Sequence, residues 1–74
     1  MRTLTERQKE IVNHIDEYIK QNGFSPSIRD IALHFEISAK GAHDHILALE
    51  KKGAIKRHFK KSRSLTILRG SGRN

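Results

Sequence analysis

The sequence predicts a single, mainly α-helical domain that ends in a small β-hairpin. Apolar residues recur at helical spacing in three stretches before Gly53, and beyond it they tend to alternate with polar residues as in a strand. A chain of 74 residues has room for one modest core and not for two. We therefore expect one domain over residues 1–69, followed at residues 70–74 by GSGRN, which is typical of a flexible linker or an engineered tail.

The first predicted helix runs from about Glu6 to Asn22. Thr5 and Gln8 have the spacing of a capping box at its start, and Gly23 can adopt the left-handed conformation that ends a helix. Its apolar residues share one stripe and are Ile11, Val12, Ile15, Tyr18 and Ile19. We expect this helix to be scaffold, with Phe24 packed back under the turn that follows it.

The second predicted helix is short and begins after Pro26, which stops the first helix from continuing into it. Ser27 can cap it by accepting a hydrogen bond from the Asp30 amide, while the Asp30 carboxylate reaches back to the Ser27 amide. Its core face has the i, i+3, i+4, i+7 spacing and consists of Ile28, Ile31, Ala32 and Phe35.

The turn into the third helix is too short for the two helices to lie antiparallel. Glu36 stands four residues after Ala32, where many helix-turn-helix motifs have glycine, so we expect backbone strain or a shifted turn. Ile37 is the expected apolar plug between the helices. This arrangement lets the second helix of the pair enter a nucleic-acid groove.

The third predicted helix runs from about Ala39 to Lys52, with Ser38 as its N-cap and Gly53 just past its end. At about 100° per residue, one narrow stripe of the helix is apolar and consists of Ala42, Ile46 and Leu49. The opposite face is available to a partner and carries Lys40, Asp44, Leu47 and Lys51.

Two strands are expected after Gly53, over residues 54–59 (AIKRHF) and 64–69 (SLTILR), with Ile55, Leu65 and Ile67 facing inward. The basic residues 60–63 (KKSR) between them contain no glycine of the kind that a tight hairpin needs, which predicts a longer loop. Two short strands after a helix-turn-helix make a winged helix-turn-helix. In that fold the hairpin covers the core and its tip touches phosphates.

Positive charge is concentrated at one end of the chain. Residues 1–50 hold six Lys and Arg against eight Asp and Glu, a balance of −2, whereas residues 51–74 hold nine Lys and Arg and no acid, a balance of +9; together they give the net charge of +7. This asymmetry is typical of a protein that meets a polyanion at that end. A basic tail that serves only solubility is the weaker alternative.

Other classes of function find little support in the residues. The chain has no cysteine for a disulfide or thiolate metal site, and no apolar run long enough to span a bilayer. His43 and His45 lie about 200° apart around a helix, too far to chelate one ion, and the common nucleophile, zinc and phosphate-loop motifs are missing. We expect no cofactor, no enzymatic activity, no membrane contact and a cytoplasmic location.

Four stretches resemble the N-terminal domain of the LexA repressor family, which controls the bacterial SOS response to DNA damage. They are LTERQKEIVNHI (residues 4–15), NGFSPSIRDIA (22–32), ALEKKGAIKR (48–57) and SRSLTIL (62–68). The resemblance implies a repressor module that reads a palindromic operator in double-stranded DNA. The family's C-terminal domain, which dimerises and cleaves the chain when RecA stimulates it, has no counterpart in these 74 residues, so we expect this piece to be monomeric.

The resemblance places base reading at the start of the third predicted helix, at Ser38, Lys40, Gly41, His43 and Asp44. Lys40 can donate to guanine, Asp44 can accept from cytosine N4, and His43 can do either according to its tautomer. Ser38 can cap the helix and bind phosphate, and Gly41 can permit close approach of the DNA. These residues differ from those of the best-known family members. The resemblance therefore implies the role of these positions in this chain but not the operator sequence that they read.

Phosphate contacts are expected from basic residues around this segment and in the hairpin, namely Arg29, Lys51, Lys52, Lys56, Arg57, Lys60, Lys61 and Arg63. Lys56 and Arg57 point to opposite faces of a strand, so both cannot face DNA equally. The alternative function is a winged-helix module that docks a protein or RNA without reading a DNA sequence.

Overall fold

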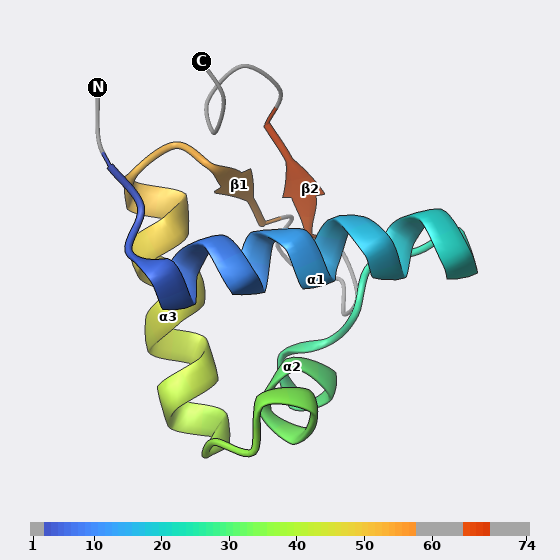
Figure 1. Ribbon diagram of the computed structural model, residues 1–74, viewed down its shortest axis with the longest axis horizontal. Coiled ribbons are helices and arrows are strands. Elements are labelled where there is room, and N and C mark those ends of the chain that lie inside the picture. Colours follow the sequence, from blue (N-terminus) through green and yellow to red (C-terminus); the bar gives the residue numbers. More distant parts are fainter. Residues whose placement is uncertain (1–2, 58–64, 69–74) are drawn as a thin grey trace.

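The computed structural model describes residues 3–57 and 65–68 (Figure 1). Three helices, α1 (Glu6–Asn22), α2 (Ile28–Phe35) and α3 (Ala39–Lys51), precede two strands, β1 (Ile55–Lys56) and β2 (Thr66–Ile67). The strands pair antiparallel, with Ile55 opposite Ile67. The predicted fold class, mainly α with a two-stranded sheet, is confirmed, although each strand is only two residues long.

Part of the sequence prediction falls outside the described residues. Three expected phosphate contacts, Lys60, Lys61 and Arg63, belong to residues 58–64, and the expected linker is residues 70–74. Among the helices that the structure describes, the longest has 17 residues, and none combines the length and apolar character needed to cross a membrane.

Side-chain caps start all three helices where the sequence predicts them. Thr5 with Gln8 and Ser27 with Asp30 form complete capping boxes at α1 and α2. The Ser38 hydroxyl accepts a hydrogen bond of 3.0 Å from the third residue of α3. Each cap satisfies backbone amides that have no partner within the helix, which stabilises the helix by about 1 kcal/mol.

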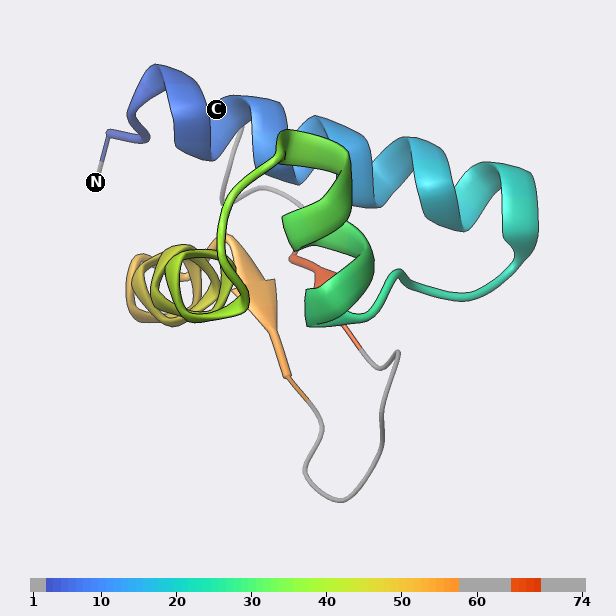
Figure 2. The same cartoon turned by 90° about the horizontal axis from the view of Figure 1, so that it is seen from below.

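One core lies where the three helices and the sheet meet. Every helix and β1 contribute side chains with at most 1% exposure, and the largest of them are Ile11, Ile15, Ile31, Ile46, Leu49 and Ile55. Leu65, 8% exposed, joins them just before β2. Figure 2 shows α3 end-on with β1 beside it and α1 running along one side of the molecule. The predicted core stripes of α2 and α3 and the predicted inward strand positions are confirmed. The stripe of α1 is confirmed except for Tyr18, whose ring contacts His14 and Phe24 instead of joining the core.

Phe24 and Ser25, adjacent residues in the loop between α1 and α2, differ in burial. Phe24 packs edge-to-face on Tyr18, with ring centroids 5.9 Å apart, yet it stays 48% exposed, so the expectation that it is covered by the turn is wrong. Ser25 is buried and its hydroxyl accepts a hydrogen bond of 2.9 Å from the Leu65 amide. This bond ties the loop after α1 to the start of β2.

The turn between α2 and α3 places Glu36 in the left-handed region, at φ 57° and ψ 45°. A side chain in this conformation costs roughly 1–2 kcal/mol relative to glycine's freedom, so the strain expected from the missing glycine is confirmed. The next amide, that of Ile37, donates to the Ala32 carbonyl at 3.0 Å. That bond and the packing of Ile37 against the core hold the turn in place.

Candidate nucleic-acid interface

The outer face of α3 is the candidate interface. The inner face is fully buried through Ala42, Ile46 and Leu49, so the opposite side of the helix must face solvent. The exposed residues there are those that the sequence predicts: Lys40, Asp44, Leu47 and Lys51. Among the remaining expected phosphate contacts, Arg29 on α2 and Lys56 on β1 are also exposed.

Two of the expected base-reading side chains pair with each other. Lys40 Nζ donates to Asp44 Oδ2 at 3.3 Å, one helical turn apart, and the two side chains are 85% and 59% exposed. An ion pair this exposed contributes well under about 1 kcal/mol. The two groups can therefore be separated at little cost, and they present a donor and an acceptor side by side on the outer face of α3.

The start of α3 is tightly built around Ser38 and Gly41. Ser38 uses its hydroxyl to cap the helix by accepting from the Gly41 amide. A Cβ at position 41 would lie 3.2 Å from the Ser38 Oγ, closer than such atoms usually approach. Glycine at position 41 therefore leaves room for the Ser38 cap. This is a structural role in addition to the close approach to DNA that the sequence predicts.

His43 lies on the side of α3 next to the sheet. There it contacts Arg57, which the sequence predicts to be a phosphate contact. Arg57, just after β1, turns toward α3 rather than outward. Its Nε donates to Glu50 Oε1 at 3.1 Å, and its Nη1 lies 3.4 Å from His43 Nε2. The Arg57 side chain is 28% exposed, whereas Lys56 on the other face of the strand is exposed. This confirms that the two basic residues point apart.

Lys52 is held by the protein itself. Its ammonium donates to Gln8 Oε1 at 2.7 Å and to the Thr3 carbonyl at 3.0 Å. Gln8 is buried at 7% exposure, and the same oxygen accepts from the Thr5 amide in the capping box of α1. Lys52 thus joins the end of α3 to the start of α1, a role that the sequence pattern did not indicate.

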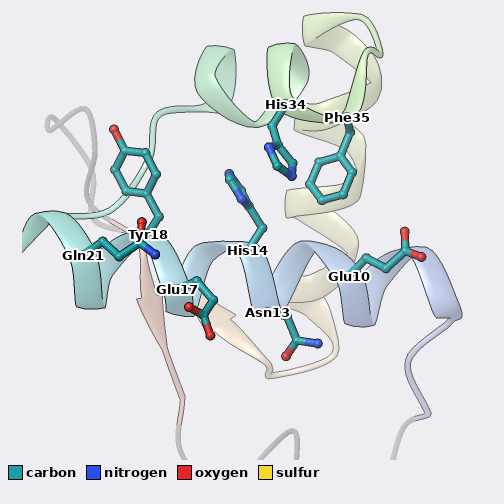
Figure 3. A pocket seen from close by; sticks show the side chains of 8 residues that line it. All are labelled: Glu10, Asn13, His14, Glu17, Tyr18, Gln21, His34 and Phe35. Atoms are coloured by element: carbon teal, nitrogen blue, oxygen red, sulfur yellow. The ribbon is translucent and has the colours of Figure 1, made fainter.

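A shallow hollow lies between α1 and α2 (Figure 3). Within it the rings of His14 and His34 stack, with centroids 3.9 Å apart and planes 16° apart, and Phe35 meets both edge-on. Other polar groups around it include Glu10 and Glu17. Within residues 3–57 and 65–68, no three His, Cys, Asp or Glu side chains are arranged to hold a metal ion.

Burial and the neighbouring His34 lower the pKa of His14 from 6.5, and attraction from Asp30 opposes this only in part. Its Nε2 is buried without a hydrogen-bond partner among the described residues. Both observations favour a neutral ring in the folded protein.

Acid should therefore destabilise the domain through His14. The unfolded chain takes up this proton more readily than the folded chain, so the contribution of His14 to the free energy of unfolding is full above pH 6.5 and is lost as the pH falls toward the lower folded pKa. An NMR titration should give His14 a midpoint below 6.5, and His34→Gln should raise it part of the way back. A midpoint at or above 6.5 would contradict this account.

Comparison with known proteins gives consistent results. A family model described as LexA DNA binding domain matches residues 1–64. The chain is 56% identical over 69 residues to the LexA repressor of Thermosipho africanus, covering 93% of this chain and 35% of that protein. It is 49% identical over 67 residues to that of Thermotoga maritima (90% and 34%) and 42% identical over 71 residues to that of Leptospira biflexa (96% and 35%). The chain thus spans about a third of the length of these relatives.

Proposed function

The chain belongs to the LexA DNA-binding domain family, and from this membership we propose that it is the operator-recognition module of a bacterial SOS-type repressor, acting in the cytoplasm by sequence-specific binding to double-stranded DNA. The observation that carries the proposal is the outer face of α3. That face is exposed, carries the charged side chains of Lys40, Asp44 and Lys51, and belongs to a helix whose other side is buried in the core.

α3 enters the major groove, whose width of about 12 Å admits a helix. Lys40 is placed to donate to guanine O6 or N7, and Asp44 to accept from cytosine N4. Since the two side chains lie within 3.3 Å of each other, they can read one G·C pair or two neighbouring pairs. His43 reaches a third base edge from the flank, while Gly41 lets the backbone of α3 come close.

Phosphates are bound around this helix. The Ser38 end of α3 presents the positive end of the helix dipole, and Arg29, Lys51 and Lys56 supply exposed positive charge. Lys60, Lys61 and Arg63 add charge in the segment between the strands. We assign Lys52 a structural role instead, because its ammonium is already bonded to Gln8 and Thr3.

Lys51 and Lys52 provide a matched pair for this assignment. Lys51→Ala should reduce the slope of log K against log salt by about 0.9, the effect of one phosphate contact. Lys52→Ala should leave the slope nearly unchanged and instead lower the free energy of unfolding by about 1–2 kcal/mol, because it leaves Gln8 without a charged partner. Salt-dependent binding and urea unfolding of both variants test this, and a slope that falls equally for both would refute it.

Repression follows if the bound domain occupies promoter DNA. One copy makes few base contacts, so we propose that useful affinity comes from two copies on the half-sites of a palindrome. The part of the relatives that this chain does not span would join the copies and respond to RecA; alone, the chain is monomeric and binds weakly.

The test is a titration against three nucleic acids. A palindromic duplex is first selected from a random pool with this domain, then compared with a scrambled duplex of the same composition and with a structured RNA, each at two salt concentrations. The selected duplex should bind most tightly, and the scrambled duplex should show only the salt-dependent component. Equal affinity for all three would favour an RNA- or protein-docking module and end the repressor proposal.

A further inference from the structure

We propose that Arg57 fixes the tautomer of His43 and thereby decides which hydrogen-bonding group His43 offers to DNA. The inference rests on the proposed function, since it concerns how α3 reads bases. It makes Arg57 a specificity-determining residue that acts from the hairpin without touching a base itself.

The geometry of three side chains carries this proposal. His43 and Glu50 are seven residues apart, so they project from the same side of α3, two turns from each other. Arg57 comes from beyond β1 and spans the gap, with Nε at 3.1 Å from Glu50 Oε1 and Nη1 at 3.4 Å from His43 Nε2. Both members of the Arg57–Glu50 ion pair are partly covered, at 28% and 36% exposure, which limits screening by water.

A hydrogen bond between Arg57 and His43 is possible in only one arrangement of protons. Arginine has five N–H donors and no acceptor, so His43 Nε2 must accept the hydrogen bond from Nη1. The ring is then neutral and its proton lies on Nδ1. Because the two ring nitrogens lie on different edges, the Nδ1–H points away from Arg57.

This arrangement restricts what His43 can read. A ring that presents an N–H matches acceptors in the major groove, which are guanine O6 and N7, adenine N7 and thymine O4. The opposite tautomer would present a lone pair and match the amino groups of cytosine or adenine. Arg57 thus selects the first class of base edge, and Glu50 is a positioning residue that holds the guanidinium in place for this purpose.

The first measurement concerns the free domain and needs no DNA. Long-range ¹H–¹⁵N spectra of the histidine rings, recorded where His43 is neutral, should show its proton on Nδ1. Arg57→Met should shift the proton toward Nε2, which solvated histidine prefers. Lys56→Met removes the same charge from the neighbouring residue on the other face of the strand and should leave the tautomer unchanged. A proton on Nε2 in the unaltered domain would overturn the proposal, even if Arg57→Met failed to fold.

The second measurement is the base preference of the same three proteins, determined by selection from a random duplex pool. Arg57→Met should reduce discrimination about five- to ten-fold at one position of the half-site, the effect of a single hydrogen bond, and leave the others unchanged. Lys56→Met should weaken all duplexes alike. If Arg57→Met does the same, with the tautomer unchanged, Arg57 is only a phosphate contact and the inference is wrong. If even the unaltered domain shows no base preference, the proposed function is wrong. The spectra of the free domain still decide separately whether Arg57 fixes the tautomer of His43.

Discussion

Replacing both Lys40 and Asp44 with alanine should remove most of the preference for the selected duplex while leaving affinity for scrambled DNA nearly unchanged. Each well-placed side chain discriminates against a wrong base by about 1–3 kcal/mol, so the two together supply roughly 30-fold to 10⁴-fold. The double change removes one positive and one negative charge, so the net charge is the same. Since both side chains are largely exposed, the fold should not be affected.

The matched comparison is Lys60→Ala with Lys61→Ala, which removes two positive charges between the strands. This double variant should bind every duplex more weakly and reduce the salt slope by up to about 1.8, with the order of preferred sequences preserved. Competition binding with selected and scrambled duplexes at several salt concentrations separates the two outcomes. Should both double variants behave alike, the division into base-reading and phosphate-binding residues would have to be abandoned.

Ile46→Ala should have the largest effect on stability, lowering the free energy of unfolding by about 3 kcal/mol. Ile46 is fully buried on the inner face of α3, and shortening it leaves a cavity where the helices meet. A domain of 74 residues has little stability in excess, so a substantial fraction of the variant should be unfolded at physiological temperature. DNA binding should then fall in proportion to the folded fraction, without a change in sequence preference.

Leu47→Ala is the control for that change, because it truncates the neighbouring residue, which is 38% exposed on the outer face. It should cost about 1 kcal/mol or less. Urea unfolding followed by circular dichroism measures both variants. Equal losses would mean that the orientation of α3 described above is incorrect.

Local patterns in the sequence predicted most of the fold. The capping boxes at Thr5 and Ser27 and the stripe through Ala42, Ile46 and Leu49 depend on residues within one or two helical turns, so spacing alone identifies them. The Lys40–Asp44 ion pair is equally short in range, although the sequence predicted only that the two residues share a face of the helix. Features that depend only on nearby residues can therefore be predicted from the sequence.

Contacts between distant residues could not be predicted in this way. Lys52 meets Gln8 across 44 positions and Ser25 meets the Leu65 amide across 40, and nothing in periodicity reveals where a long side chain ends after folding. The same limit applies to the candidate site. Sequence reasoning placed Arg57 among the phosphate contacts, whereas its reach across to Glu50 and His43 depends on how β1 packs beside α3.

The left-handed Glu36 has a consequence for how this domain can diverge. Glycine at that position would relieve the backbone and, after allowing for glycine's greater entropy when unfolded, return about 1 kcal/mol. That gain is comparable to the loss of a helix cap such as Ser38. A single substitution in the turn before α3 can therefore offset a destabilising change of similar size elsewhere in the domain, including one on the outer face of α3.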